Sequence, residues 1–503
     1  MGIRRFLIVC FVFIGFCVLA FGQLPAFDQG SGVTFQPNIV VFIADDVSWN
    51  DFGCYGNPSV RTPHTDALAA NGIKFTNAYL TASSCSPSRS SIITGRYPHN
   101  TGKAAELHLA IADHLPWIPQ LLQEEGYFTA LSGKDHMKKE DGSQTEFWDH
   151  YDRGRVEGNQ GGHANWVEVV QNRPTNHPFF FWFAASDAHR HWDADADWVK
   201  ELYGPKTDPA DVVVPPFLLD IRETRQDLAS YYNEVIRFDY FLGQVVAELK
   251  IQEVLDTTLI LVLADNGRPF PRAKTRLHDS GMKTALVAHW PFGIKDPGTS
   301  DSLVSVIDFA PTFLQLADGE ESDTFQGVSM LPLFKDKDAE IRQYAFSEHN
   351  WHDYEALARS VRTKDWLYLE NFRTKSAWQG PADSVRSPSF QQLLVHKKIG
   401  VLSKVQAEIF LSPRPAAELY NMKLDPHQLK DLATEDSRAG IQRSLKGILK
   451  IWMQETGDSI PELVSQDEFH RETGIRIVND HSYRYETPGE SKNASEINRH
   501  GPQ

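Results

Sequence analysis

Short apolar runs that end in polar residues recur along the chain, with segments of helical period between them. The run 39–44 is wholly apolar and is followed by two aspartates, and "YFTALS" (127–132), "FFFWFAA" (179–185) and "TLILVLA" (258–264) also lead into polar side chains. Runs of this length and composition predict buried strands. Helical patterns lie between them, among them a stretch closed by Gly72, one that stops at Gly126, and a long one at 227–250.

This alternation of strands and helices predicts an α/β fold with a large, mostly parallel sheet flanked by helices. Ligands of such sheets bind beyond the carboxyl ends of the strands. The polar residues that follow the apolar runs are therefore placed where an active site is expected.

After about residue 346 the pattern changes. "RSVRTKDWLYLENFR" (359–373) predicts a hairpin, "AAELYNMKLDPHQLKDLA" (416–433) a strand and turn, and "LKGILKIWMQETGD" (445–458) an amphipathic helix. We therefore expect a main domain at 23–345, a smaller C-terminal α+β subdomain at 346–483, and a flexible polar tail at 484–503.

The first 22 residues have the order of a secretory signal peptide. Arg4 and Arg5 precede an apolar run at 6–21, and Ala20-Phe21-Gly22 forms a small-x-small cleavage pattern. No later stretch is comparable, so no membrane span is expected. The pattern predicts a secreted or periplasmic protein, or a lysosomal one in a eukaryotic host.

Composition and charge narrow the classes of partner. The chain has 503 residues, enough for a real core, and a net charge of −16, which argues against nucleic acid or an anionic membrane as partner. Only Cys54 and Cys85 remain after the signal peptide. A chain this long needs no disulfide, so we interpret Cys54 as structural, whereas Cys85 is either a buried structural cysteine or a chemical group.

Oxygen-bearing side chains follow two of the predicted strands. Asp45 and Asp46 end the first, and Asp265 and Asn266 end the run at 258–264. Each pair alone also fits a helix cap or a tight turn. Together, at two strand ends, they predict a site for a hard cation, Ca²⁺ or Mg²⁺, rather than zinc.

Cys85 stands where a helix is expected to begin, in "TASSCSPSRSSIITG" (81–95). A helix N-terminus lowers a thiol pKa, and Arg89, four residues on, returns to the same helical face. A soft thiolate is nevertheless a poor ligand for a hard cation. This mismatch indicates that Cys85 does not act as a cysteine.

"CSPSR" followed by "SSIITG" resembles the signature of the type I sulfatases of the alkaline phosphatase superfamily. The order "NIVVFIADD", "GKDH", "LADNG" and "ELYNMKLDP" extends the resemblance over nearly the whole mature chain. Within this family the chain is most similar to the N-sulfoglucosamine sulfohydrolases, or heparan sulfamidases, in "SSCSPSRSS", "DAHR", "DNGRPFP", "SPSFQQLL" and "WMQETGD".

The resemblance implies an alkaline phosphatase-like fold and a modified nucleophile. A formylglycine-generating or sulfatase-maturating enzyme would oxidise Cys85 to formylglycine (3-oxoalanine). One hydroxyl of its hydrate, on Ca²⁺, would attack sulfur, and the second would then lose its proton so that sulfate is eliminated. The metal ligands implied are Asp45, Asp46, Asp265, Asn266 and the modified Cys85, and Arg89 would orient the modified residue.

The resemblance also implies four further site residues. Lys134 would contact the sulfate, His136 the hydrate, and His189 the sulfate and leaving group, whereas Lys134 as a solvated loop residue and His189 as a polar surface residue are the plain alternatives. Lys274 stands where the sulfamidases have an arginine, as a second sulfate-binding cation. "SDAH" (186–189) departs from the family's usual H-D-P-H. Candidate pocket residues without a firm motif are Arg190, His108 and His278.

The resemblance predicts a secreted sulfatase of sulfated carbohydrates, sulfamidase-like in specificity. The first alternative is an O-sulfatase of a marine polysaccharide such as ulvan or carrageenan. A phosphodiester or phosphonate monoester hydrolase is more distant, because such enzymes usually carry further metal ligands and the sequence reveals no second set. A non-catalytic glycan-binding relative is disfavoured by the intact Cys85, Pro87 and Arg89.

Overall fold

The computed structural model describes residues 35–157, 159–478 and 483–503, so the expected signal peptide at 1–22 lies outside the described residues. Residues 36–503 form one compact unit. No helix in the described ranges is long and apolar enough to cross a membrane. The strands are β1 Asn38–Ala44, β2 Ile73–Tyr79, β3 Phe128–Gly133, β4 His150–Asp152, β5 Phe179–Ala184, β6 Thr258–Ala264, β7 Leu286–His289, β8 Gly298–Ser305, β9 Ala345–His349, β10 Ala358–Arg362, β11 Trp366–Asn371 and β12 Ala417–Asn421.

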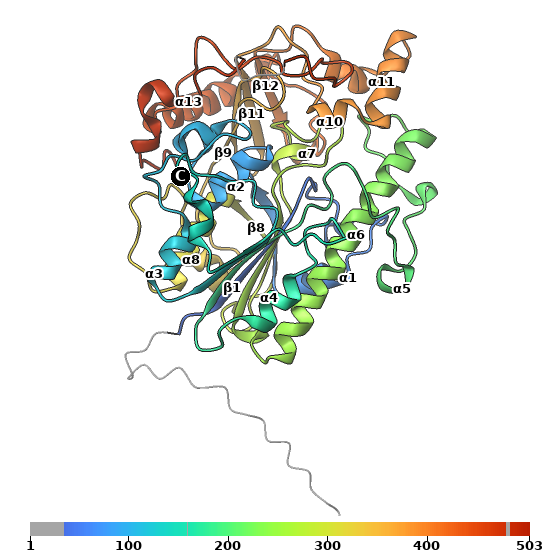
Figure 1. The fold of residues 1–503 in the computed structure, drawn as a ribbon. Helices are drawn as coiled ribbons and strands as arrows, with labels where there is room; N and C mark the ends of the chain where they lie inside the picture. Colours follow the sequence, from blue (N-terminus) through green and yellow to red (C-terminus); the bar gives the residue numbers. More distant parts are fainter. Residues whose placement is uncertain (1–34, 158, 479–482) are drawn as a thin grey trace, which may run out of the picture. The chain divides into compact units, whose positions relative to one another are not determined.

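The centre of this unit is an eight-stranded sheet with the order β4-β3-β5-β1-β6-β7-β2-β8 (Figure 1). The pairs β1–β5, β1–β6, β3–β5, β3–β4 and β2–β8 are parallel, and β7 runs antiparallel to β6 and β2. The expected mostly parallel sheet is therefore confirmed. β1 lies in its middle and is buried on both faces, which explains why its sequence is continuously apolar.

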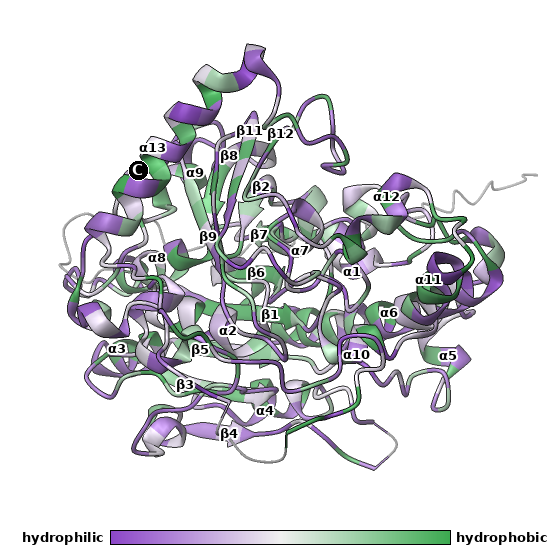
Figure 2. Ribbon diagram, turned by 90° about the horizontal axis from the view of Figure 1, so that it is seen from above, coloured by the Kyte–Doolittle hydropathy of each residue, from purple (hydrophilic) through white to green (hydrophobic). Residues whose placement is uncertain are grey.

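Helices cover both faces of this sheet. Val40 and Phe42 of β1 pack with α1, α4 and α6 on one face, and Ile39 and Val41 pack with α2, α3 and α8 on the other. Figure 2 shows hydrophobic residues along the strands of this sheet, whereas α13 carries both kinds of residue. The helices are α1 Pro63–Ala70, α2 Cys85–Thr94, α3 Ile118–Glu124, α4 Trp166–Asn172, α5 Lys200–Tyr203, α6 Arg222–Ile251, α7 Asp279–Met282, α8 Phe309–Leu316, α9 Leu331–Lys335, α10 Ala382–Val385, α11 Pro388–Lys398, α12 Lys404–Ala407 and α13 Ala439–Glu455.

Predicted helix bounds differ from the structure at α1, α6 and α13, and α13 spans Ala439–Glu455 rather than 445–458. α6 begins at Arg222, before the expected start, because its charged first turn carries no apolar period. α1 ends at Ala70 with Asn71 as its C-cap, so Gly72 is not the stop that the sequence predicted. Gly72 is needed for another reason: a Cβ there would lie 2.1 Å from the Ala288 carbonyl oxygen of β7.

The residues after 345 build a second, antiparallel sheet with the order β12-β11-β10-β9. The predicted hairpin is β10–β11, and α13 covers the sheet through Trp452, which stacks on Phe346 with ring centroids 4.9 Å apart. The smaller α+β part is thus confirmed. Between β11 and β12 the chain returns to the main body, where α11 packs with α6 in one apolar cluster. The domain boundaries at 345 and 483 stay a prediction.

The C-terminal segment differs from the flexible tail expected at 484–503. The guanidinium of Arg96 is fully buried and donates to the carbonyl oxygens of Ser495 at 3.0 Å and Ile497 at 2.9 Å. It also donates to Asn498 Oδ1 at 2.7 Å. A buried guanidinium needs such acceptors, so this segment is a structural part of the protein.

Candidate active site

The two predicted acidic pairs meet at one edge of the large sheet. β1 and β6 are parallel with Ala44 opposite Ala264, so the residues that follow leave the sheet side by side. The Asp46 amide donates to Asp265 Oδ1 at 3.2 Å, and Asn266 Nδ2 donates to Asp46 Oδ1 at 2.6 Å. Asp45, Asp46, Asp265 and Asn266 are all buried.

Cys85 opens α2 above these strand ends, as the sequence predicted. Its Sγ lies 3.8 Å from Asp45 Oδ1 and 3.6 Å from Asp46 Oδ1. Burial raises the pKa of the thiol well above its ordinary value, and Lys134 and Lys274 offset only part of that rise. The lowered thiol pKa expected at a helix N-terminus is therefore outweighed, and the residue is a poor thiolate nucleophile at neutral pH.

Arg89 lies one turn further along α2 and joins three elements. Its Nε donates to Asp265 Oδ2 at 2.7 Å, and its Nη1 donates to the Lys134 carbonyl oxygen at 2.9 Å. Its Nη2 lies 3.7 Å from Asp45 Oδ1 and is buried without a hydrogen-bond partner among the described residues. A free N–H beside the Cys85 helix turn is available to an oxygen of a modified residue or a ligand.

Lys134 and Lys274 approach the cluster from two sides. Lys134 Nζ contacts Asp45 Oδ2, and Lys274 Nζ lies 2.7 Å from Asp46 Oδ1. Burial alone would lower the pKa of each lysine, but Asp45 raises the pKa of Lys134, and Asp46 raises that of Lys274 well above its ordinary value. Both ammonium groups therefore stay charged and can attract an anion.

The donor set at the strand ends fits a hard divalent cation. Ligand atoms of Asp45, Asp46 and Cys85 lie within 4.8 Å of one another. Asn266 Oδ1 is buried and has no hydrogen-bond partner in the described ranges, although a buried amide oxygen normally has one. Carboxylate and amide oxygens are the usual ligands of Ca²⁺. The cluster is thus able to hold a metal ion.

Two histidines lie beside the cluster. The rings of His108 and His136 have centroids 4.9 Å apart, and His136 Nδ1 is buried without a partner among the residues described. Burial, reinforced by Lys134, lowers the pKa of His136 well below its ordinary value, and burial with Arg484 lowers the pKa of His108 to about 4. Both rings are therefore neutral at pH 7, and each has one ring nitrogen that can accept a hydrogen bond.

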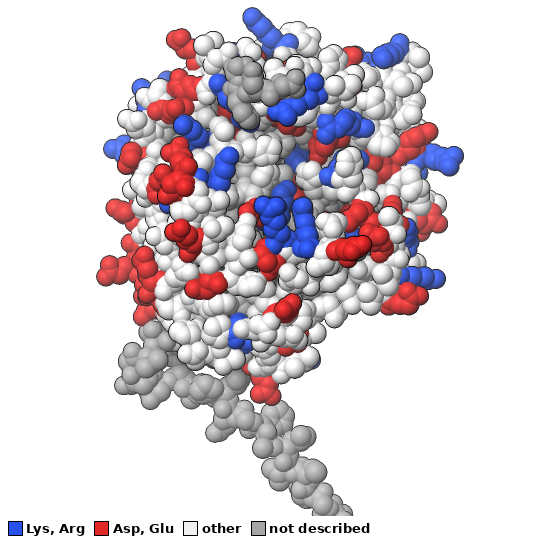
Figure 3. Space-filling view, viewed as in Figure 1, with Lys and Arg blue, Asp and Glu red and all other residues white. Residues whose placement is uncertain are grey.

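His189 stands at the mouth of a cavity of about 490 Å³ that also reaches Asp45, Lys134 and Arg155. Its side chain is 37% exposed, and its Nδ1 lies against the Arg190 carbonyl oxygen, which leaves Nε2 facing the site. In Figure 3, Lys and Arg side chains gather around a hollow near the middle of the face shown, with acidic groups to either side. An anionic ligand would find positive charge there despite the negative net charge.

The remaining candidates divide between the cavity and the interior. Arg190 lines the cavity, but its guanidinium is bound by Asp227 at 2.9 and 3.0 Å and stacks 4.0 Å over Trp192. His278 is buried 3.4 Å from Glu418 Oε2 in the second sheet, among residues outside the cluster. Cys54 and Cys85 both carry free thiols, but only Cys85 lies in the cluster.

Sequence reasoning missed three residues on the far side of the site. Asp383, at the start of α10, has its Oδ2 3.9 Å from His189 Nε2 and 4.0 Å from Lys274 Nζ. His352 Nδ1 lies 2.7 Å from the Ser84 hydroxyl, directly before Cys85, and Asp353 accepts the Ala382 amide at 2.9 Å. An acid in a first helical turn and a polar loop are ordinary features, so no local signal marked these residues.

Two family models match the chain, and they overlap at residues 272–319. The model described as sulfatase matches residues 37–319, and that of the C-terminal part of N-sulphoglucosamine sulphohydrolase matches 272–398. The chain belongs to the sulfatase family. The expected resemblance is confirmed.

Relatives and solved structures agree with this assignment. An ulvan-active sulfatase of Formosa agariphila is 28% identical over 86% of this chain and 83% of its own length. The N-sulphoglucosamine sulphohydrolase of Homo sapiens is 29% identical over 84% of this chain and 90% of its own. A structure solved with D-glucosamine-2-N,6-O-disulfate has a TM-score of 0.61 at 19% identity, covering 83% of this chain and 98% of its own. One solved with a neocarrahexaose has a TM-score of 0.62 at 21% identity, covering 83% and 92%.

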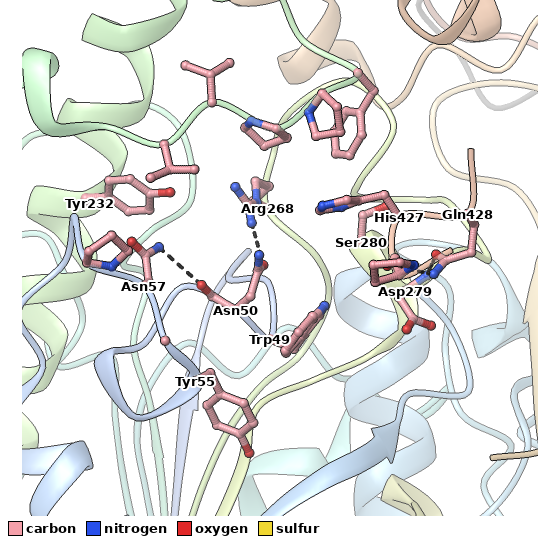
Figure 4. Close-up of a pocket in the computed structure, with 18 residues that line it drawn as sticks. Trp49, Asn50, Tyr55, Asn57, Tyr232, Arg268, Asp279, Ser280, His427 and Gln428 are labelled. Carbon is pink, nitrogen blue, oxygen red and sulfur yellow. Dashed lines mark hydrogen bonds between the residues drawn. The ribbon is translucent and has the colours of Figure 1, made fainter. Parts of the chain in front are cut away.

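A second pocket of this sulfatase, of about 300 Å³, lies beside the loop that follows β1 (Figure 4). It contains none of the predicted site residues. Its arginine, Arg268, donates to Asn50 Oδ1 at 2.6 Å and pairs with Asp51 at 3.0 Å. Both contacts hold the Arg268 guanidinium at the wall of this pocket.

A second metal site was the feature that distinguished the phosphodiester hydrolases. Asp46, His189 and Asp383 have ligand atoms within 4.8 Å of one another. The ammonium of Lys274 contacts Asp46 and faces Asp383, so it supplies the positive charge that a second cation would bring. The arrangement therefore favours one metal ion and a basic sulfate pocket.

Proposed function

We propose that this sulfatase removes sulfate groups from sulfated carbohydrates, with position 85 carrying formylglycine as the nucleophile. The observation that carries the proposal is the buried Cys85 thiol, which lies among oxygen ligands with the cations of Lys134, Lys274 and Arg89 around it. A soft, protonated thiol is chemically out of place there, whereas a hydrated aldehyde presents an oxygen. The relatives named for ulvan and for N-sulphoglucosamine, and the structures solved with a glucosamine disulfate and with a neocarrahexaose, support a glycan substrate.

The strand-end residues Asp45, Asp46, Asp265 and Asn266, with the oxygen of the modified residue 85, would hold Ca²⁺, or Mg²⁺ in its place. The cation would supply positive charge that lowers the pKa of a hydroxyl at that position. Arg89 holds Asp265 and leaves one N–H for the modified side chain.

The remaining residues bind the sulfate and move protons. Lys134 and Lys274 remain charged and can bind the sulfuryl oxygens, where negative charge grows during cleavage. His136 is neutral, so a ring nitrogen would accept a hydrogen bond from the second hydroxyl and assist the elimination of sulfate. His189 projects Nε2 into the cavity, where it can meet the leaving group.

The proposal includes maturation and export. A formylglycine-generating or sulfatase-maturating enzyme would read "CSPSR" and oxidise Cys85, and the pattern at 1–22 would direct the chain to the periplasm, the cell exterior or, in a eukaryote, the lysosome. The substrate is either an N-sulfated amino sugar or an O-sulfated polysaccharide such as ulvan or carrageenan.

The test is maturation followed by a substrate panel. We expect protein produced with a maturation enzyme to contain formylglycine at position 85 by peptide mass spectrometry, and to release sulfate from at least one sulfated oligosaccharide. Cys85→Ala is the control and should release none. An unmodified thiol in fully active protein, or faster release of phosphate from phosphodiesters than of sulfate, would overturn the proposal.

A further inference from the structure

Asp383 places a carboxylate in a pocket built for an anion. Its Oδ1 accepts the Ser384 amide at 2.6 Å, whereas its Oδ2 is buried and has no hydrogen-bond partner among the residues described. Oδ2 faces His189 Nε2 at 3.9 Å and Lys274 Nζ at 4.0 Å. One oxygen of this side chain is therefore held by the backbone, and the other is free for a ligand.

This carboxylate is charged. Burial alone would raise the pKa of Asp383, but Lys274 and His189 outweigh that effect and lower the pKa below its ordinary value. An ionised carboxylate only accepts hydrogen bonds, and it repels a sulfate. Its presence is favourable only if the rest of the substrate brings a hydrogen-bond donor or a positive charge.

Asp383 could also be present only to balance the charge of Lys274, but this explanation of the carboxylate is weaker. The Lys274 ammonium lies 2.7 Å from Asp46 Oδ1 and only 4.0 Å from Asp383, so its close partner is Asp46. Nor does Oδ2 hold α10, because Asp383 binds the Ser384 amide through Oδ1, and Asp353 accepts the Ala382 amide at 2.9 Å. Neither neighbour requires Asp383 Oδ2 to be where it is.

The position of Asp383 matches that of a leaving group. Asp46 Oδ1 is 3.6 Å from Cys85 Sγ, and ligand atoms of Asp46, His189 and Asp383 lie within 4.8 Å of one another. A sulfuryl group placed over position 85, between Lys134 and Lys274, therefore has its leaving atom on the side of His189 and Asp383.

We propose that Asp383 selects a nitrogen leaving group, that is, the sulfamate of a 2-amino sugar rather than a sulfate ester; this rests on the sulfatase function proposed above. A sulfamate nitrogen carries a hydrogen that Oδ2 accepts, whereas an ester oxygen has none and gains negative charge as the S–O bond breaks. As the hydroxyl oxygen of the modified residue 85 bonds to sulfur and the S–N bond breaks, the nitrogen keeps the bonding pair and takes the proton that this hydroxyl releases, which makes it an amine. A second proton, from water, makes it an ammonium, which the carboxylate attracts.

The experiment compares two sugars that differ at the reacting atom: N-sulfoglucosamine and glucose 2-sulfate. Sulfate release by the matured protein gives kcat/KM for each, and we expect the wild type to prefer the sulfamate. Asp383→Asn should lose about 10- to 100-fold on N-sulfoglucosamine, the range for a hydrogen bond to a charged group, and less than about threefold on glucose 2-sulfate.

Asp353→Asn is the matched control, because it removes a neighbouring carboxylate whose oxygen already holds the Ala382 amide. This control should change kcat/KM by the same factor on both sugars. Inhibition gives a second measurement: glucosamine should inhibit the wild type more strongly than glucose, and Asp383→Asn should abolish that difference. If Asp383→Asn is unstable by its melting temperature, Asp383→Ser serves for both measurements.

Equal losses on the two sugars, or a wild type that prefers glucose 2-sulfate, would overturn the role of Asp383. Failure of the proposed function looks different. In that case the wild type releases no sulfate from any sulfated sugar or aryl sulfate, and the difference between glucosamine and glucose as ligands is then measured by calorimetry on the same variants. If the wild type binds glucosamine and glucose equally well in that measurement, the role of Asp383 is also overturned.

Discussion

Two sides of the site are built in different ways. The strand-end cluster (Asp45, Asp46, Cys85, Arg89, Asp265 and Asn266) is buried at the ends of β1 and β6 and the start of α2. The outer wall (His189, His352 and Asp383) comes from loops and from α10, is exposed at His189, and keeps a free carboxylate oxygen. Lys274 lies between the two, in contact with Asp46 and facing Asp383.

The difference indicates a division of labour. Each strand-end residue contacts others of the cluster, so the cluster is pre-organised and suits a chemistry common to many substrates. The outer wall has room and unused hydrogen-bonding capacity, which suits recognition of the sugar. We therefore expect changes in the cluster to abolish all turnover, and changes in the wall to depend on the substrate.

The largest effect should follow Asp265→Ala. It removes an anionic metal ligand and the partner of Arg89, so we expect loss of turnover on every substrate, on the order of 10⁴-fold or more, as for members of a catalytic unit. Bound Ca²⁺ measured by elemental analysis should fall with it, while circular dichroism stays close to that of the wild type. Zinc in the active protein, or full activity after chelation, would contradict the assignment of the cluster.

A smaller, substrate-dependent effect is expected for Lys274→Ala and His189→Ala. Removing one donor aimed at developing charge commonly costs about a hundredfold in rate, so kcat should fall more than KM rises. An aryl sulfate needs little help at its leaving group and should lose less than a sulfated sugar. Lys103→Ala, at an exposed lysine paired with Glu140, is the control. The same loss on both substrate types would refute the leaving-group role.

The contact between the Ser84 hydroxyl and His352 ties the cluster to the wall. Ser84 precedes α2 but does not cap it, because its hydroxyl lies 2.7 Å from His352 Nδ1 instead. Losing one such hydrogen bond in the interior should lower kcat by roughly tenfold. Ser84→Ala, His352→Phe and the double variant should show similar losses in a double-mutant cycle. Additive losses would mean that the two residues act independently.

The smallest effect concerns stability. Burial raises the pKa of Asp353 to about 6, so the folded protein binds this proton more tightly than the unfolded chain does. The wild type should therefore lose stability as pH rises from about 4 to above 6. Asp353→Asn keeps an acceptor for the Ala382 amide, and its side chain does not ionise, so this variant should not lose stability in that way as the pH rises. At pH 8 we expect it to be about 1–2 kcal/mol more stable than the wild type, and at pH 4 no more stable. Chemical denaturation at both pH values measures this, and an advantage at pH 4 as large as that at pH 8 would contradict it.

The sequence by itself determined the strand-end cluster and its scaffold. The apolar runs of β1 and β6 are continuous because both faces of the sheet are covered, so each run marks its own end and the polar pair that follows. Parallel strands end at the same edge, which brings Asp45 and Asp265 together without further information. Cys85 was placed by the same kind of local signal, the start of a helix.

Only the tertiary structure decided which residues form the outer wall and where the C-terminal segment packs. Asp383 reaches His189 because α10 and the helix after it pack on α6 through Val385 and Phe390, a contact between segments far apart in the sequence. The same applies to Arg96, whose buried charge draws the C-terminal segment onto the body. Local hydrophobic pattern records whether a residue is buried, but not which distant segment buries it, and that packing decides the neighbours of His189.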